Sequence, residues 1–125
     1  TGFISELALY GYKECALYNS EISEEMGYQI GMQIIDEQTC DGVFCYCDDI
    51  AVGVYKAVRE RGSSIRIIGF DGVRATEHLG ISTVSQEPGA IGTQAASFIV
   101  NLMEAHQERQ PIHHRIIPVL VDRNS

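Results

Sequence analysis

The sequence predicts an α/β fold, in which an open parallel sheet carries helices on both faces. Short runs rich in apolar residues, such as 42–47 and 65–70, alternate with segments whose apolar residues recur at helical spacing. The short runs have the continuous apolar character of strands that are covered on both sides. Right-handed crossovers then bring the carboxyl ends of the parallel strands to one edge of the sheet.

The individual elements follow from apolar spacing and from helix start and stop signals. Ser23 and the two acidic residues after it begin a helix that ends near Glu37. Asp48-Asp49 caps the next helix, which Gly62 ends. The predicted strands are 14–18, 42–47, 65–70, 82–85 and 116–121, and the predicted helices are 1–11, 23–37, 50–61, 74–79 and 89–105.

The composition is that of a folded domain. The 125 residues suffice for one domain with a core, and 45% of them are hydrophobic and 21% charged. The formal net charge of −8 argues against direct nucleic-acid binding by this chain, although a basic module elsewhere in a longer protein is compatible with it. We find no run as long as a membrane span and no signal peptide. Because Thr1 lies within a helix-like pattern and is not an initiator Met, we expect a piece of a longer protein, and the cysteines discussed next favour a cytoplasmic one.

The four cysteines are predicted to be free thiols in a reducing compartment. Cys45 and Cys47 share one face of a strand and cannot easily bridge each other. A metal site that combines them with Cys40, Asp48 and Asp49 is the alternative, but structural zinc sites space their ligand pairs differently. We therefore expect buried apolar thiols, with no metal and no cofactor.

Polar residues follow three of the predicted strands at the edge where the carboxyl ends meet. They are Asp48-Asp49, Asp71-Gly72 and Ser85-Gln86. Ligands of open parallel sheets bind at that edge, and carboxylates from two strands can accept hydrogen bonds from adjacent sugar hydroxyls. A purely structural interpretation also stands, in which the first aspartates cap a helix and Asp71-Gly72 makes a turn.

Enzymatic motifs are missing from the sequence. It has no Gly-x-Ser-x-Gly elbow, no phosphate-binding glycine loop and no metal-binding His pair on a helix. His113-His114 lies in a polar linker and is predicted to be solvated, while His78 and His106 stand alone. We therefore expect a protein that is not an enzyme.

Four motifs, in order and in register, resemble those of the lactose/galactose-repressor (LacI/GalR) family. The segment 43–53 is similar to the family's strand followed by Asn-Asp-x-x-Ala-x-Gly, and 66–72 to its Val-x-Gly-Phe-Asp-Asp turn. The segment 82–96 is similar to Thr-Thr-Val-x-Gln-Pro followed by Gly-x-x-Ala, and 122–125 to the terminal Arg-x-Ser. Gly2-Phe3 resembles the end of an Arg-x-x-Gly-Phe motif. The likeness covers nearly the whole chain.

The resemblance implies one lobe of a two-lobed, periplasmic-binding-protein-like type I fold that closes on a sugar or nucleobase. It also implies a homodimer that binds DNA only through an amino-terminal helix-turn-helix module. By position, Asp48 replaces a ligand-contacting Asn and Asp71 matches a ligand-contacting Asp. Ile22 stands where members often stack an aromatic ring on the ligand, and Tyr46 and Gln86 complete the expected ligand set.

The resemblance also implies how residues 1–125, as the carboxy-terminal part of the effector domain, are divided. They would comprise a carboxy-terminal lobe at 1–86, a crossover helix at 87–106 that normally packs on the other lobe, and a return strand and tail at 107–125. Without that lobe the apolar side chains of the helix lack partners. We expect the helix either to fold back onto its own sheet or to pair with another chain.

For a dimer interface the resemblance indicates the helix after Asp49 and the turn at 74–79. The candidate interface residues are Val52, Lys56, His78 and Leu79.

The leading interpretation is an effector-sensing and dimerisation domain of a transcriptional regulator. It would bind a small polar metabolite, a sugar, and thereby modulate DNA binding by the helix-turn-helix module. The alternative is a periplasmic or secreted sugar-binding protein of an ABC transporter, which shares the fold and the Gln-x-Pro pattern. The cysteines, the Asp-Asp-Ile-Ala segment and the Arg-x-Ser ending favour the regulator. An α/β enzyme domain, such as a receiver or hydrolase fragment, is the third interpretation.

Overall fold

The computed structural model describes residues 2–12, 15–105 and 110–125. Its elements along the chain are α1 (Gly2–Leu9), α2 (Glu24–Glu37), β1 (Gly42–Phe44), α3 (Asp48–Arg61), β2 (Arg66–Asp71), α4 (Arg74–Leu79), β3 (Ser82–Ser85), α5 (Pro88–Glu104) and β4 (Val119–Val121). The α/β class predicted from the sequence is confirmed.

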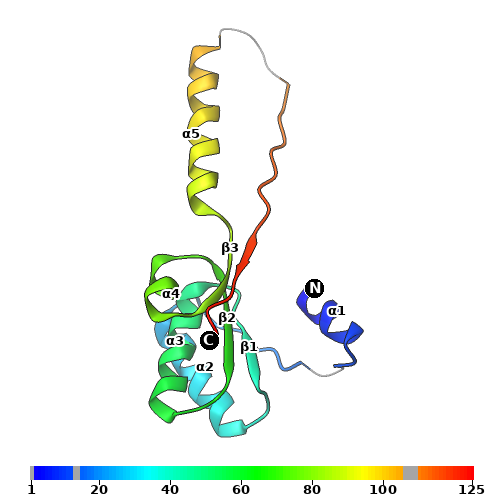
Figure 1. Ribbon diagram of the computed structural model, residues 1–125, viewed down its shortest axis with the longest axis vertical. Helices are drawn as coiled ribbons and strands as arrows, with labels where there is room; N and C mark the ends of the chain where they lie inside the picture. Colours follow the sequence, from blue (N-terminus) through cyan, green and yellow to red (C-terminus); the bar gives the residue numbers. More distant parts are fainter. Residues whose placement is uncertain (1, 13–14, 106–109) are drawn as a thin grey trace.

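One sheet with the strand order β1-β2-β3-β4 organises the body of the molecule (Figure 1). β1, β2 and β3 are parallel, whereas β4 pairs antiparallel with β3. The sheet is therefore mixed and not purely parallel as predicted, because the chain returns to it from the far end of α5 in the opposite direction. α2 and α3 lie on one side of the sheet and α1 lies on the other, where the ring of Phe3 stacks on that of Phe44 at a centroid distance of 4.9 Å.

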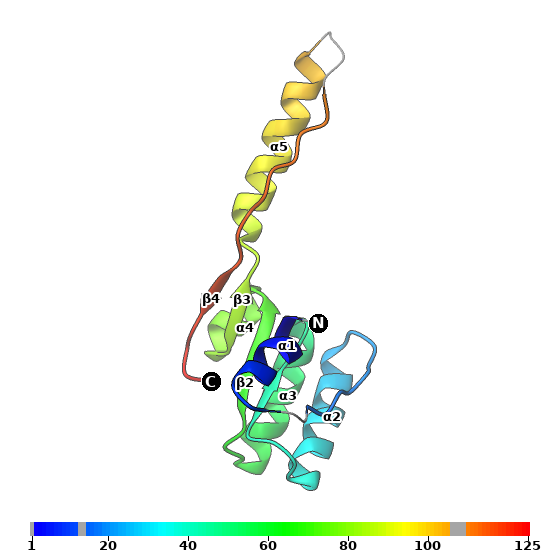
Figure 2. The ribbon, with the colours of Figure 1, turned by 90° about the vertical axis from the view of Figure 1, so that its right-hand side faces the viewer.

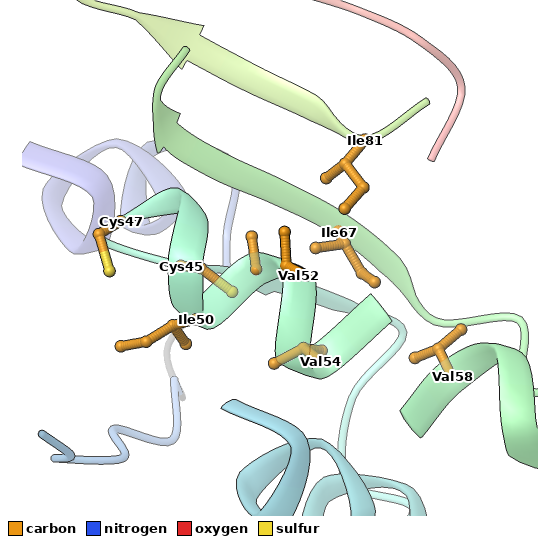
Figure 3. Packing of buried hydrophobic residues seen from close by; sticks show 9 residues of the cluster. Cys45, Cys47, Ile50, Val52, Val54, Val58, Ile67 and Ile81 are labelled. Atoms are coloured by element: carbon orange, nitrogen blue, oxygen red, sulfur yellow. The ribbon is translucent and has the colours of Figure 1, made fainter. Parts of the chain in front are cut away.

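The hydrophobic core lies between α3 and the sheet (Figure 3). Helix α3 contributes a nearly continuous buried face, and Ile67 of β2 and Ile81 before β3 are at most 1% exposed opposite it. Helix α2 packs on the outer side of α3. Glycines allow this close approach, because a Cβ atom at Gly53 would lie 2.0 Å from the carbonyl oxygen of Glu24.

Local capping accounts for the helix boundaries that the sequence predicts. The Ser23 side chain accepts a hydrogen bond from the backbone N–H of Met26, 3.1 Å away, at the start of α2. Gly62 and Gly80 adopt left-handed conformations at the ends of α3 and α4, where glycine avoids the steric cost of a side chain.

Three predicted strands differ from the structure. Residues 15–18 form no strand, and Glu14 lies outside the described residues. Instead, the Tyr18 hydroxyl donates a hydrogen bond to Glu37 at 2.6 Å, so this segment is held by its side chain and not by a strand ladder. The strand predicted at 42–47 ends at Phe44, because the backbone turns there to start α3, and the strand predicted at 116–121 is limited to β4.

Helix α5 projects away from the sheet, and the chain then runs back towards β4 (Figures 1 and 2). None of its residues is buried, and Ile91, Phe98 and Leu102 are each more than 40% exposed. The predicted folding of this helix onto its own sheet is therefore wrong. Its pairing with another chain stays a prediction. Among the described residues, no helix combines the length and apolar character needed to cross a membrane.

The tail at 122–125 ties the amino ends of β2 and β3 together. The Ser125 hydroxyl donates to the carbonyl oxygen of Ile67 at 2.6 Å and accepts from the backbone N–H of Ser82 at 2.7 Å. The Arg123 guanidinium donates to the carbonyl oxygen of Ile81 at 2.7 Å. The Arg-x-Ser ending therefore has a structural role in this fold.

We expect Ser125→Ala to lower the free energy of unfolding by about 2 kcal/mol, because the backbone groups of the buried residues Ile67 and Ser82 lose their partner. Urea denaturation of the variant measures this change. Ser64→Ala is the matched control, since Ser64 lies at the same edge and its side chain makes no hydrogen bond to the described residues. Equal midpoints for the two variants would contradict a structural role for the tail.

Candidate functional site at the carboxyl edge of the sheet

Asp71 and Gln86, which the sequence predicts as ligand contacts, lie together at the carboxyl edge. The strand register places Asp71 opposite Ser85, directly before Gln86. The Gln86 side-chain amide donates a hydrogen bond to Asp71 Oδ1 at 2.6 Å, and its backbone N–H donates to the Asp71 carbonyl oxygen at 3.1 Å. Both side chains are half-buried at the rim of the sheet. The structure thus brings this predicted pair into direct contact.

The turn after β2 has an unusual backbone. Asp71 has φ 124°, in a region that residues with a side chain rarely adopt. Gly72 follows with φ 83°, and a Cβ atom there would lie 2.6 Å from the Ser85 hydroxyl oxygen. Backbone strain of this kind costs about 1–3 kcal/mol and persists where surrounding contacts enforce it, often at functional sites.

Asp48 does not face the rim in the way that the sequence predicts. Its side chain is 1% exposed. Oδ2 accepts hydrogen bonds from the backbone N–H groups of Gly72 and Val73, both at 2.8 Å, and Oδ1 accepts from the Thr83 hydroxyl at 2.7 Å. Cys47, and not Asp48, is the N-cap residue of α3. A direct ligand contact by Asp48 does not fit this placement, because its acceptor sites are taken up inside the protein.

Tyr46 and Ile22 lie at the surface on the β1 side of the sheet. Their exposed fractions are 50% and 62%, and the Tyr46 hydroxyl donates to the Ser20 carbonyl oxygen at 3.3 Å, next to the loop that carries Ile22. Within the described residues, no hydrogen bond joins these two side chains to Asp71 or Gln86. Their contact with a ligand stays a prediction.

Asp49 is the exposed carboxylate of the Asp48-Asp49 pair. The sequence could not tell which of the two is buried, because adjacent residues of a helix point in different directions and only the packing of the helix on the sheet decides which direction is buried.

The candidates for a dimer interface divide into one buried residue and three exposed ones. Val52 is 5% exposed and points into the core beside Ile67 (Figure 3). It is not accessible to a partner, so this assignment is wrong. Lys56 is exposed and forms an ion pair with Glu24 of α2. His78 and Leu79 are exposed at the end of α4 and remain predicted interface residues.

Two concavities of about 290 Å³ each lie at the opposite, amino edge of the strands. Arg66, Asn124 and Ser125 line both of them. They therefore adjoin the tail that ties β2 to β3 and are separate from the predicted ligand edge.

All four cysteines are free thiols, and Cys45 and Cys47 are buried. Burial raises the pKa of Cys45 to about 12, so this thiol is protonated at neutral pH. Cys40 is half-buried, and its pKa is also raised by burial. Among the residues that the structure describes, no group of three or more His, Cys, Asp or Glu side chains is arranged to hold a metal ion. His113 and His114 are exposed, as predicted, whereas His106 lies outside the described residues.

Comparison with known proteins identifies the family. The profile of the periplasmic binding protein-like domain matches residues 1–125. The HTH-type transcriptional repressor PurR of Glaesserella parasuis is 25% identical over 121 residues, which is 87% of this chain and 36% of the repressor. The HTH-type transcriptional regulator RegA of Clostridium acetobutylicum is 28% identical over 101 residues, 74% of this chain and 29% of that regulator.

Solved structures share the fold over nearly the whole chain. A probable transcription regulator from Thermus thermophilus superposes with a TM-score of 0.86 at 30% identity, covering 98% of this chain and 50% of the other. A LacI family transcriptional regulator from Enterococcus faecium, solved with bound ribose, superposes with a TM-score of 0.86 at 25% identity, covering 98% and 48%.

The chain spans about a third of the length of these curated relatives and about half of these solved chains. Its motifs, its fold and its match to the family profile agree. The chain therefore belongs to the periplasmic-binding-protein-like domain family, in the branch formed by the LacI-type transcription regulators.

Proposed function

We propose that this chain is the effector-sensing and dimerisation part of a LacI-type transcriptional regulator, and that it binds a small polar metabolite at the carboxyl edge of its sheet. The observation that carries the proposal is the contact between Asp71 and Gln86 on the strained turn at that edge. Ligands of open α/β sheets bind at this edge.

A sugar is the proposed class of effector. An ionised carboxylate accepts strong hydrogen bonds from hydroxyl groups, and among the described residues Gln86 is the one side chain that donates to the Asp71 carboxylate at the rim. The similar regulator from Enterococcus faecium was solved with bound ribose, which supports the same class of ligand here.

The exposed apolar face of α5 supports a second lobe elsewhere in the full protein. The solved relatives contain about as much chain again as the part that superposes on this one. We propose that 1–86 is the carboxy-terminal lobe, that 87–106 crosses to the other lobe, and that 107–125 returns. Effector binding between the lobes would shift a two-state equilibrium and thereby change DNA binding by a separate helix-turn-helix module of a cytoplasmic homodimer. The curated relatives are transcriptional regulators. This favours a regulator's sensor domain over the binding protein of a transporter, and it favours a role without enzymatic activity.

The test is ligand binding by the intact protein. We expect D-ribose, or another member of a panel of sugars and nucleobases, to raise the melting temperature and to bind in calorimetry with one site per chain. The same compound is expected to change the affinity of the protein for its operator DNA. A panel in which every compound leaves both the melting temperature and operator affinity unchanged would contradict the proposal.

A further inference from the structure

Asp48 connects three elements from the interior of the molecule. It is the first residue of α3, and its carboxylate accepts hydrogen bonds from the turn between β2 and α4 through Gly72 and Val73, and from β3 through Thr83. The amino end of α3 also favours a negative charge at this position. The carboxylate is therefore out of contact with solvent, and hydrogen bonds from the turn and from β3 take the place of water.

Two neighbours adapt to this carboxylate. A Cβ atom at Gly69 of β2 would lie 2.2 Å from Asp48 Oδ1, so the strand admits the carboxylate only because glycine stands there. The Thr76 hydroxyl lies 3.2 Å from Asp48 Oδ2 but 2.7 Å from the Val73 carbonyl oxygen. Its single proton serves the shorter bond, so Thr76 chiefly closes the turn that Asp48 holds.

We infer that Asp48 is the positioning residue of the proposed effector site, and that its carboxylate fixes the turn 71–73 in the shape that presents Asp71. The two N–H groups that it binds directly follow Asp71, whose φ of 124° needs enforcement by its surroundings. On the other side, Gln86 fixes the Asp71 side chain. Without the Asp48 carboxylate, the turn relaxes and Asp71 leaves its position at the rim.

This inference rests on the proposed function where it assigns Asp71 to the ligand, so the experiment has two independent measurements on the intact protein. The first is hydrogen exchange of backbone amides in wild type and Asp48→Ala. We expect exchange at Gly72 and Val73 to become about tenfold faster, while amides in the α2–α3 contact keep their wild-type rates. The second is calorimetry with D-ribose, in which we expect affinity to fall about tenfold.

Asp49→Ala is the matched control, because it removes a neighbouring carboxylate that is exposed at the same helix start. It should leave exchange at Gly72 and Val73 unchanged. Asp48→Asn should restore most of the protection, since the amide oxygen can accept from Gly72 and Val73 while its NH₂ group donates to the Thr83 hydroxyl. If the alanine variant does not fold, the asparagine variant carries the comparison, with exchange at these amides about twofold faster than in wild type.

Exchange that rises uniformly over the domain, or that stays at the wild-type rate in the turn, would overturn the inference, because a merely structural acidic residue affects all elements that it supports. Faster exchange confined to the turn supports it even if wild type does not bind D-ribose. In that case only the sugar in the proposed function fails.

Discussion

Gly53→Ala is expected to lower the free energy of unfolding by about 3 kcal/mol or more. A Cβ atom at this position would lie 2.0 Å from the Glu24 carbonyl oxygen and 2.5 Å from the Tyr28 backbone nitrogen. Both contacts are with the backbone of α2, which cannot rotate away as a side chain can. Helix α2 must therefore move off α3, and the close contact between the two helices opens.

The measurement is urea denaturation followed by circular dichroism. Gly92→Ala serves as the control, because an added Cβ atom at Gly92 of α5 meets nothing within 4 Å. Alanine has a better helix propensity than glycine by about 1 kcal/mol, so this variant should not lose stability. A loss of similar size in both variants would mean that the helix contact through Gly53 is looser than the structure describes.

Asp71→Ala is expected to weaken effector binding by the intact protein by about 10- to 100-fold, the loss typical of a hydrogen bond to a charged group. Affinity for operator DNA in the absence of effector should not change, because the residue acts only at the carboxyl edge. Asp71→Asn separates charge from shape: its side-chain oxygen can still accept from Gln86, so it should retain the turn and lose part of the affinity.

Calorimetry and an operator-binding assay measure the two quantities. Asp41→Ala removes an exposed carboxylate just before β1, at the opposite edge of the sheet, and should behave as wild type in both. Unchanged effector affinity in Asp71→Ala would exclude this residue from the ligand contacts. Lost operator binding in the same variant would indicate damage to the fold and not to the site.

Local signals in the sequence predict the helices well. α2 and α3 begin and end within two residues of the predicted limits, because Ser23 and Gly62 make hydrogen bonds to residues a few positions away, and the acidic Asp48 and Asp49 suit the first turn of a helix. Strands are less well predicted. Residues 15–18 have strand-like composition but form no strand, since a strand requires a neighbour that only the folded sheet provides.

The candidate site was predicted in part. The sequence placed Asp71 and Gln86 at one edge, and they are hydrogen-bonded there. It assigned Asp48 to the ligand in place of the motif's Asn. The spacing to Ala51 and Gly53 instead matches Asp48 to the motif's Asp and Cys47 to its Asn, and the structure buries the Asp48 carboxylate under the turn 71–73. The resemblance assigned Val52 to a dimer interface, but the structure places it in the core, because a likeness to a family identifies a helix and not which of its faces meets the sheet.

The sequence by itself determined the α/β class, the order of the helices, the family and the edge at which polar residues collect. These features depend on periodicity, capping and motifs, which act over short stretches of chain. Only the tertiary structure decided that Asp48 supports the site from within, that β4 runs antiparallel, and that α5 projects with its apolar face uncovered. Such features depend on which segments, distant in the sequence, pack against each other. That packing decides whether a side chain is buried or exposed.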